Sequence, residues 1–293
     1  KYIVLNKSIF TLIQMEYSAF EEAVVPICSF VLKNGEEKEK GLYFRLTEFK
    51  GGMEIQRKKV LEALKNKECG YFYEASKENF GKIPGMPIGY WASENLLKDF
   101  EKGIKVCDLL EPKVGLQTGD NDRFLRQWYE VVENRISYKT ESTEESMDNG
   151  YKWYPSNKGG ERRQWYGNYD YIVNWEKDGI EIKNFKDNKG KLRSRPQNTN
   201  YYFKEAITWS LITSGGFSIR YREKGGIHDV SGHFVYSNKS ILLKYFLGMM
   251  GTKISDYIFK ILNPTINLSR GVVANFLVIE HEHIKPKVIS IFD

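Results

Sequence analysis

The sequence predicts a mixed α/β fold built from helices and several short strands. Apolar side chains recur every three or four positions over residues 53–66 and 239–262, which is the helical pattern. An apolar run rich in β-branched residues at 23–33, and short alternating segments between glycines in the second half, indicate strands. Hydrophobic residues make up 41% of the chain and charged residues 28%, so we expect a buried core rather than general disorder.

The first hundred residues predict strands followed by helices. The continuous apolar run at 23–33 is typical of a strand buried on both faces. Residues 41–48 alternate, and they predict a second strand antiparallel to the first through the charged turn at 34–40. Further elements of this half are a helix over 53–66, a strand at 71–73, and a helix over 93–102 with Ser93 as the expected N-cap.

The second half predicts short strands and one long C-terminal helix. The Pro- and Gly-rich segment 84–89 is the candidate linker, and 137–160 is a second loop region. Strands are expected at 169–175, 207–212, 217–221 and 233–236. The helix at 239–262 is expected to break near Gly251 and to end at Pro264, before a closing apolar segment at 272–279.

The positive charge is concentrated in the second half of the chain. The formal net charge is +6, yet residues 1–150 carry 22 basic against 25 acidic side chains. Residues 151–230 carry 15 against 9, and residues 231–293 carry 7 against 4. This asymmetry suggests a polyanion as partner of the second half, and a solvated basic face without a partner is the open alternative.

The cysteines and the apolar runs indicate a cytoplasmic protein without membrane contact. The three cysteines are an odd number without metal-ligand spacing, which is typical of reduced thiols. No apolar run approaches the roughly 20 residues that a membrane span needs. The opening residues resemble neither an initiator segment nor a signal peptide, so we expect a fragment of a longer chain.

Two loops carry residue types that suit contacts with nucleic acid. Residues 115–124 (GLQTGDNDRF) combine glycines with Asn and Asp, and such a tight loop can approach a phosphate backbone closely. Thr118 and Asn121 are its candidate contacts, and a plain turn is the alternative. In residues 159–170 Arg162 and Arg163 lie next to Trp165, which combines phosphate or guanine donors with a stacking ring. A solvated surface loop is the alternative there.

Two further segments are basic. Residues 183–202 form the densest basic run, with Lys186, Lys191, Arg193 and Arg195 as candidate backbone contacts. In residues 209–224 Arg220 and Arg222 alternate with Tyr221, so on a strand both arginines share one face and would suit groove reading. For the basic run, a solvated surface is the competing interpretation.

Two patterns resemble metal or nuclease sites, but we expect neither function. Asp178, Glu181 and Lys183 contain the E-x-K string of metal-dependent nucleases, a string short enough to arise by chance. His281 and His283 alternate with glutamates, as polar termini often do. The glycine and serine signatures of nucleotide-binding loops and hydrolases are absent from the sequence, so we predict no catalytic and no metal-binding residues.

Long strings of the sequence resemble the PglX family, the adenine-specific DNA methyltransferases of bacterial BREX phage-defence systems, which are related to type IIG restriction–modification enzymes. The strings are MEYSAFEEAVVPICSFVLKN, GLQTGDNDRFLRQWYEV, GGERRQWYGNYDYIVNWEKDGIEIKNF, KLRSRPQNTNYYFKEAITWSLITSGGFSIRYREKG and ILNPTINLSRGVVANFLVI. The resemblance implies that the whole enzyme transfers a methyl group from S-adenosylmethionine to adenine and flips the target base. It also implies a target-recognition domain similar to that of TaqI-type methyltransferases.

The chain departs from the complete family pattern at the catalytic motif. The Asn/Asp-Pro-Pro-Tyr/Phe motif is absent, because Asn263 and Pro264 are followed by Thr265 and Ile266. The glycine-rich cofactor loop is also absent from the sequence. The resemblance therefore implies a segment that binds no cofactor and has no activity of its own, cut from an enzyme that uses S-adenosylmethionine.

The sequence thus predicts two parts with different roles. Residues 1–105 are expected to be the tail of a methyltransferase catalytic sheet with a connector, and residues 106–293 an α+β target-recognition domain. Double-stranded DNA is the expected partner, with other defence-system proteins as possible partners. A protein-interaction module that docks another defence component or a phage inhibitor is the alternative. The expected DNA contacts are Thr118, Asn121, Arg162, Arg163, Trp165, Lys186, Lys191, Arg193, Arg195, Arg220 and Arg222.

Overall fold

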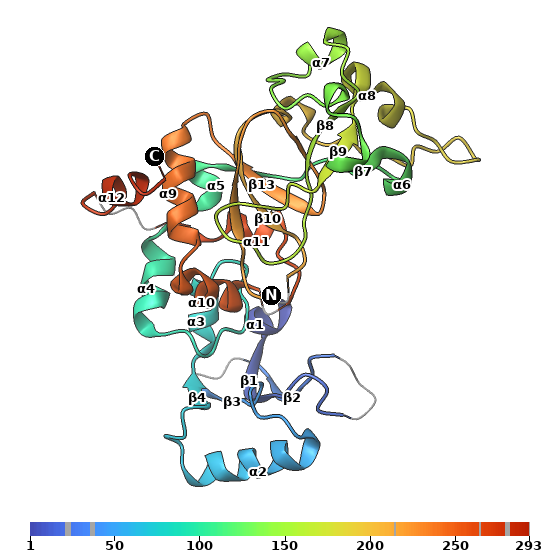
Figure 1. Ribbon diagram of the computed structural model, residues 1–293. Coiled ribbons are helices and arrows are strands. Elements are labelled where there is room, and N and C mark those ends of the chain that lie inside the picture. Colours follow the sequence, from blue (N-terminus) through green and yellow to red (C-terminus); the bar gives the residue numbers. More distant parts are fainter. Residues whose placement is uncertain (21–24, 36–38, 214, 264, 279–281, 293) are drawn as a thin grey trace. The chain divides into compact units, whose positions relative to one another are not determined.

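The computed structural model divides the chain into two compact units, Lys1–Gly103 and Ile104–Asp293. It describes residues 1–20, 25–35, 39–213, 215–263, 265–278 and 282–292. Both units combine helices with small sheets, so the expected mixed α/β class is confirmed (Figure 1). The division falls close to the expected boundary at residue 105, while the different roles of the two parts stay a prediction.

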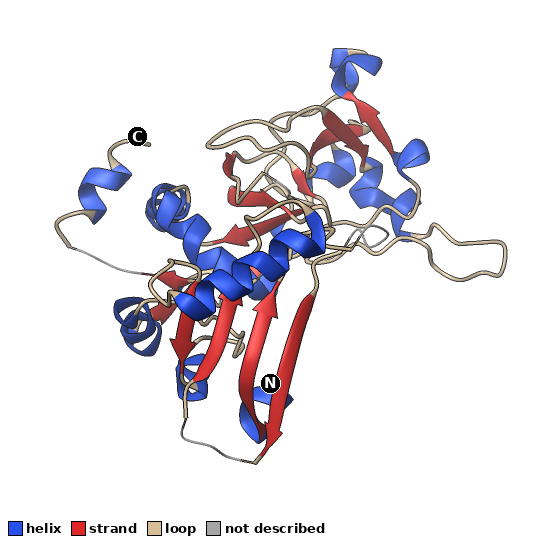
Figure 2. Cartoon of the chain, turned by 90° about the horizontal axis from the view of Figure 1, so that it is seen from below, coloured by secondary structure: helices blue, strands red, loops and turns tan. Residues whose placement is uncertain are grey.

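Unit 1 is built on a four-stranded sheet of order β2-β1-β3-β4 (Figure 2). Its strands are β1 (Lys7–Gln14), β2 (Cys28–Asn34), β3 (Gly41–Arg45) and β4 (Phe72–Ala75). Strand β1 pairs antiparallel with β2 and parallel with β3, and β3 pairs antiparallel with β4. The expected antiparallel pairing of 41–48 with the preceding strand is therefore wrong, because β1 lies between the two.

Strand β2 lies at the edge of this sheet, and the expectation of a strand buried on both faces is also wrong. Its residues from Cys28 to Val31 are exposed, including the large side chain of Phe30. The first part of the expected strand, residues 21–24, lies outside the described residues. An apolar run at a sheet edge gives the same sequence signal as a central strand, since periodicity does not report which neighbours a strand has.

Adjacent residues of β3 place their side chains in two separate cores of unit 1. Tyr43 stacks on Tyr90 with ring centroids 4.7 Å apart, within a core that also holds Phe80. Phe44 packs in the second core with Ala63 of helix α2 (Gly52–Lys65), which covers that face of the sheet. The other helices of unit 1 are α1 (Tyr2–Asn6), α3 (Lys77–Lys82) and α4 (Glu94–Lys102).

The local predictions for unit 1 are largely confirmed. The helix expected at 53–66 is α2, and the hydroxyl of Ser93 caps α4 by accepting a hydrogen bond from the Leu96 amide at 3.3 Å. The Pro- and Gly-rich segment 84–89 is not at the division between units. Its residues Met86 and Ile88 pack against the core of unit 1.

Unit 2 contains three small sheets. The first, of order β11-β10-β13-β6, is antiparallel throughout and comprises β6 (Glu111–Lys113), β10 (Ala206–Ser210), β11 (Ile219–Arg222) and β13 (Gly232–Tyr236). The second, of order β12-β8-β9-β7, comprises β7 (Leu125–Gln127), β8 (Trp153–Asn157), β9 (Tyr171–Asn174) and β12 (Ile227–His228). The third pairs β5 (Ile104–Lys105) with β14 (Leu277–Val278).

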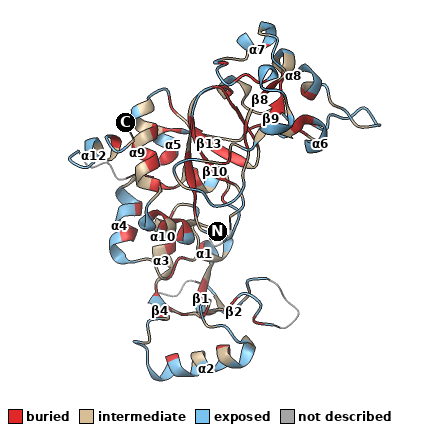
Figure 3. Ribbon diagram, in the orientation of Figure 1, coloured by how far each residue is buried: buried red, intermediate tan, exposed pale blue. Residues whose placement is uncertain are grey.

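Aromatic side chains fill the core beside the second sheet. Trp175 is fully buried, and its ring meets that of Tyr202 edge to face at 5.1 Å. Phe203 packs on Tyr154 of β8 in the same cluster. Figure 3 shows buried residues concentrated on the strands of unit 2, with exposed residues on its outer loops. The core thus gives the surrounding loops a fixed base.

The long C-terminal helix expected at 239–262 is two helices, α9 (Ser240–Met250) and α10 (Lys253–Leu262). The break at Gly251 was predicted, and its cause is packing against the loop at 159–170. A Cβ atom at Gly251 would lie 2.0 Å from the Trp165 ring. Thr252 then caps α10 by accepting a hydrogen bond from the Ser255 amide.

The remaining helices of unit 2 are short. The expected closing segment 272–279 is divided between helix α11 and strand β14, and its last residue, like Pro264, lies outside the described residues. No helix in the described part of the chain is long and apolar enough to cross a membrane. The short helices are α5 (Val106–Leu109), α6 (Asn121–Phe124), α7 (Glu145–Asp148), α8 (Glu176–Lys183), α11 (Arg270–Ala274) and α12 (Lys285–Ile289), with 3-10 turns at Trp128–Glu130, Glu133–Arg135 and Thr199–Tyr201.

The Ser93 cap leads to a stability prediction for unit 1. Replacing Ser93 with Ala removes the acceptor of the Leu96 amide, and we expect it to lower the free energy of unfolding by about 1 kcal/mol. Ser76, which precedes α3 without a side-chain cap, is the matched control. Ser76→Ala should change the free energy by a few tenths of that amount in urea unfolding, and equal losses for both variants would contradict the capping argument.

Two buried histidines predict that unit 2 loses stability in mild acid. Burial lowers the pKa of His228 to about 3 and that of His233 to about 4. Below the ordinary pKa of about 6.5 the unfolded chain gains protons that the folded chain does not, so stability falls as the pH falls. Each histidine should cost about 1.5 kcal/mol between about pH 6.5 and pH 5.

The measurement is the pH dependence of urea unfolding, compared between the wild-type chain and one variant. His228 stacks on Phe234 with ring centroids 3.9 Å apart, so His228→Phe keeps an aromatic ring while removing one titrating group. This variant should show a shallower loss of stability between about pH 6.5 and pH 5 than the wild-type chain. An unchanged slope in His228→Phe would refute the assignment.

Candidate nucleic-acid interface

Residues 185–193 of unit 2 form a projecting hairpin, which we name the basic hairpin. The Asp187 amide donates to the Lys191 carbonyl at 2.8 Å, and the Arg193 amide donates to the Phe185 carbonyl at 2.9 Å. The Asp187 carboxylate accepts from two amides of the turn, and Gly190 supplies the positive φ of 78° that the turn needs. The hairpin extends away from the rest of unit 2 in both views (Figures 1 and 2).

The basic hairpin carries exposed cations without internal partners. Its basic side chains are Lys186, Lys189, Lys191 and Arg193, all exposed, against Asp187 as its single acidic residue. Within the described residues none of the four forms an ion pair, although Arg193 lies over the Phe185 ring at 5.2 Å. A projecting segment with unpaired positive charge is suited to an external anion.

The base of the basic hairpin is fixed to the glycine-rich loop at 115–121. The backbones of Gln117 and Arg195 exchange two hydrogen bonds, of 3.1 and 2.8 Å. Gly119, with a φ of 78°, approaches so closely that a Cβ atom would lie 2.7 Å from the Arg193 carbonyl group. The loop that carries the exposed Asn121 is therefore held against the backbone of Arg193 and Arg195.

Thr118 is corrected as a candidate DNA contact. Its side chain is only 3% exposed, and its hydroxyl donates to the Asn121 side chain at 2.6 Å. The neighbouring Asp120 caps helix α6 by accepting from the Arg123 amide. Thr118 thus orders the loop from within, while the exposed Asn121 stays a candidate for contact.

The loop at 159–170 lies along the edge strand β11 and presents two exposed arginines, Arg162 and Arg163. Trp165 joins this edge, because its amide donates to the Ile219 carbonyl and its carbonyl accepts from the Tyr221 amide. Its ring lies 5.5 Å from the Phe292 ring and against Gly251. Part of the Trp165 ring is therefore buried against Phe292 and Gly251, and the rest of its surface is exposed.

Two open recesses lie beside the loops at 115–121 and 159–170, and Lys158 lines both of them. One, of about 340 Å³, is lined by the glycine-rich loop together with Asp229 and Ser231. The other, of about 350 Å³, lies under residues 159–163 and includes Arg163. Lys158 also lies over the Tyr171 ring at 5.1 Å. The loops at 115–121 and 159–163 therefore border one continuous stretch of surface.

Arg220 and Arg222 do share one face of a strand, but that face is buried, so the expectation of an exposed basic face on this strand is wrong. Their side chains are 0% and 4% exposed. Arg220 donates to the hydroxyls of Ser218 and Ser210 at 3.0 and 3.2 Å. Desolvation lowers the pKa of Arg220 to about 10 and also lowers the pKa of Arg222. Strand alternation predicted that Arg220 and Arg222 lie on the same face of β11, but it did not predict that other residues cover this face.

The E-x-K string lies on helix α8 in ion pairs rather than in a metal site. Glu181 accepts from Arg123 at 2.7 Å, a hydrogen bond that lowers the pKa of Glu181. Lys183 pairs with Asp178 at 2.6 Å. The described residues hold no cluster of side chains with metal-ligand geometry, while His281 lies outside them.

Comparisons with known proteins relate this chain to methyltransferases. No family model matches it. It is 36% identical over 286 residues to the adenine-specific methyltransferase PglX of Lacticaseibacillus casei (strain Zhang), which covers 93% of this chain and 23% of that protein. It is 34% identical over 293 residues to the adenine-specific methyltransferase BrxX of Escherichia coli O9:H4 (strain HS), which covers 97% of this chain and 22% of that protein. The chain is a homologue of PglX and BrxX. It spans less than a quarter of the length of these curated relatives.

A solved structure of a restriction–modification enzyme resembles the fold of this PglX homologue. The type IIL enzyme MmeI, solved in complex with DNA, matches 98% of this chain and 38% of its own with a TM-score of 0.53 at 10% identity. The type IIG restriction endonuclease BpuSI gives a TM-score of 0.38, which is too low to support an argument. At such low identity the likeness to MmeI concerns the fold alone.

No sequence pattern indicated Lys158 as a member of this surface. Lys158 directly precedes Gly159 and Gly160, and all three residues line the same recess. A single lysine in a sequence does not predict a binding surface. Lys189 was part of the basic run without being selected, and it lies in the turn of the basic hairpin. Of the expected contacts, Arg162, Arg163, Lys186, Lys191, Arg193 and Arg195 are exposed.

The attachment of the basic hairpin leads to a stability prediction. Gly119→Ala combines an unfavourable positive φ with a clash against the Arg193 backbone, so we expect a loss of about 2–4 kcal/mol in the free energy of unfolding of unit 2. Gly190→Ala is the matched control, because Gly190 has the same φ of 78° but open space around it. That variant should cost about 1 kcal/mol, and equal losses in chemical denaturation would show that the close approach contributes nothing.

Proposed function

We propose that the chain is the DNA-recognition portion of an adenine-specific DNA methyltransferase, and that unit 2 meets the duplex. The observation that carries the proposal is the basic hairpin, with four exposed cations and no internal ion pairs among the described residues. Lysine and arginine side chains bind nucleic acid chiefly by neutralising phosphates and releasing counterions. The exposed Arg162, Arg163 and Arg195 extend this positive surface beyond the hairpin.

The shape of the hairpin supports contact with a groove. The major groove of B-DNA admits a two-stranded ribbon, and phosphate contacts on both sides fix the register of such a ribbon. The glycine-rich loop at the hairpin base brings backbone amides and Asn121 near the same surface. We propose a target-recognition arrangement of the TaqI type for residues 106–293, with residues 1–105 as the end of the catalytic sheet and a connector.

The comparisons support the proposal in two ways. The relatives are adenine-specific methyltransferases, and MmeI, whose fold this chain resembles, was solved in complex with DNA. The likeness to PglX supports the further proposal that the whole protein acts in phage defence or restriction–modification, with S-adenosylmethionine as methyl donor. The sequence of this segment contains neither the Pro-Pro catalytic motif nor a glycine-rich cofactor loop. We therefore assign no residue of this chain to S-adenosylmethionine or to methyl transfer, and we place both in the remainder of the enzyme.

The test is the salt dependence of duplex binding. Removing three cations in Lys186→Ala/Lys191→Ala/Arg193→Ala should weaken binding of a paired duplex and reduce the slope of log affinity against log salt by about 0.9 for each lost phosphate contact. Fluorescence anisotropy of a labelled duplex between low and physiological salt measures both quantities. The triple variant should therefore lose up to about 2.7 in slope.

The matched control is a triple variant of exposed lysines in unit 1, Lys65→Ala/Lys98→Ala/Lys102→Ala. It removes the same formal charge and should leave the slope nearly unchanged. Equal effects of the two variants would indicate attraction by net charge alone. Absence of duplex binding at low salt would overturn the proposal in favour of a protein-binding module.

A further inference from the structure

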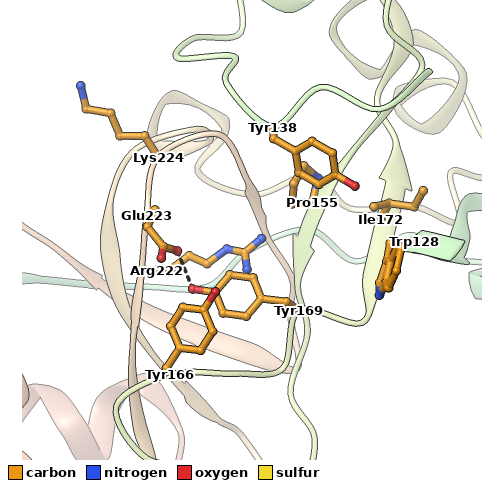
Figure 4. A pocket seen from close by; sticks show the side chains of 9 residues that line it. All are labelled: Trp128, Tyr138, Pro155, Tyr166, Tyr169, Ile172, Arg222, Glu223 and Lys224. Atoms are coloured by element: carbon orange, nitrogen blue, oxygen red, sulfur yellow. Dashed lines mark hydrogen bonds between the residues drawn. The ribbon is translucent and has the colours of Figure 1, made fainter. Parts of the chain in front are cut away.

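Unit 2 has an aromatic recess that is lined by one of the expected DNA contacts, Arg222, and otherwise by residues outside the expected set. It has a volume of about 390 Å³, within the range of small-ligand sites. Three of its aromatic side chains are accessible at the opening, with Trp128 52% and Tyr166 62% exposed and Tyr138 also exposed. The lining is completed by Tyr169, Pro155, Ile172, Arg222, Glu223 and Lys224. Figure 4 shows Trp128 across the recess from Tyr166 and Glu223, with Arg222 reaching between them.

The buried Arg222 ends in this recess without a hydrogen-bond partner at Nη1. Its guanidinium lies over the Tyr169 ring at 4.2 Å, and no described carboxylate forms an ion pair with it. A Cβ atom at Gly226 would lie 2.8 Å from Nη2, so the glycine provides the space that the guanidinium occupies. A buried donor without an acceptor is costly, and a ligand with acceptor atoms would satisfy it.

The arrangement of polar groups around the recess suits a planar ligand with both acceptors and donors. Arg222 offers donors at the floor, and the Glu223 carboxylate offers acceptors at the side, where it already accepts from the Tyr169 hydroxyl. Guanine has the matching edges, because O6 and N7 accept from arginine while its ring and exocyclic nitrogens donate. Adenine would place its exocyclic amino group against the arginine donors.

We propose that this recess binds an unpaired guanine base. Trp128 and Tyr166 stack on the base, Arg222 donates to O6 and N7, and Glu223 accepts from the donor edge. Stacking on aromatic side chains and hydrogen bonds to an exposed base edge are how proteins hold bases that have left a helix. The recess thus recognises a specific base, whereas the basic hairpin meets the phosphates.

The inference that the base comes from DNA rests on the proposed function of unit 2. The same base chemistry occurs in a free guanine nucleoside, so the experiment needs separate probes for the two sources. One set of probes is a paired duplex, the same duplex with one extrahelical guanine, and the duplex with one extrahelical adenine. The second probe is guanosine, followed by quenching of tryptophan fluorescence.

The chain should bind the duplex with the extrahelical guanine about tenfold or more tighter than the paired duplex, and tighter than the duplex with adenine. Trp128→Ala and Tyr166→Ala should each reduce the preference for guanine over the paired duplex by about fivefold or more, until little of it is left. Their affinity for the paired duplex should not change. Trp128→Phe should restore most of the preference, because a phenyl ring still stacks.

Tyr151→Ala is the control, since Tyr151 is an exposed tyrosine that does not line the recess. It should leave the preference intact. Arg222→Met tests the floor of the recess, and the two rim variants keep the test decisive if that buried substitution prevents folding. Guanosine binding that the rim variants abolish, without any preference among the duplexes, would support the recess with a free nucleoside as ligand.

The inference and the proposed function fail in different ways. Binding of the paired duplex with no preference for an extrahelical guanine, together with no quenching by guanosine, would overturn the recess and leave the DNA-recognition proposal intact. Failure of every duplex to bind would overturn the DNA-recognition proposal, and guanosine quenching in the wild type and the rim variants would then decide the recess by itself.

Discussion

The surface of unit 2 depends on the close approach of the glycine-rich loop to two neighbouring backbones. A Cβ atom at Gly115 would lie 1.9 Å from the His228 carbonyl oxygen, and one at Gly119 would lie 2.7 Å from the Arg193 carbonyl group. Only glycine permits both contacts. They fasten the base of the basic hairpin to strand β12, while Ser194 donates to the Ile182 carbonyl beneath it. The positive charge of the hairpin is thereby held away from the core on a fixed base.

The arginines of unit 2 divide into two environments that sequence patterns cannot distinguish. Arg162 and Arg163 stand on an exposed loop, whereas Arg220 and Arg222 stand on a strand whose side chains are covered by that loop. Alternation along β11 correctly predicted that the second pair shares a face. The buried face is contacted by a segment that is distant in sequence, because Arg220 donates to the Arg163 carbonyl and Arg222 lies over the Tyr169 ring.

The same distinction explains which parts of the fold were predictable. The Ser93 cap follows from residues a few positions apart, and it was predicted. The break near Gly251 was also predicted from the glycine, although the Trp165 ring that packs there comes from a distant segment. The parallel pairing of β1 with β3 and the edge position of β2 depend on which strands meet in space. The aromatic recess was equally inaccessible, because Trp128 and Arg222 come from distant segments and no sequence pattern indicates that they meet. Composition indicated the basic run that forms this hairpin, since its four cations stand within eight residues of one another.

Under the two proposals made above, the two kinds of cation would separate affinity from selectivity physically. Exposed lysines on a projecting hairpin act through long-range attraction that salt screens, and such contacts are indifferent to base identity. A guanidinium enclosed by protein acts at short range, where screening is weak and an unmatched donor is penalised. Raising the salt concentration should therefore weaken the contribution of the basic hairpin far more than that of Arg222. A recognition unit arranged in this way becomes more selective, relative to its total affinity, as non-specific attraction is screened.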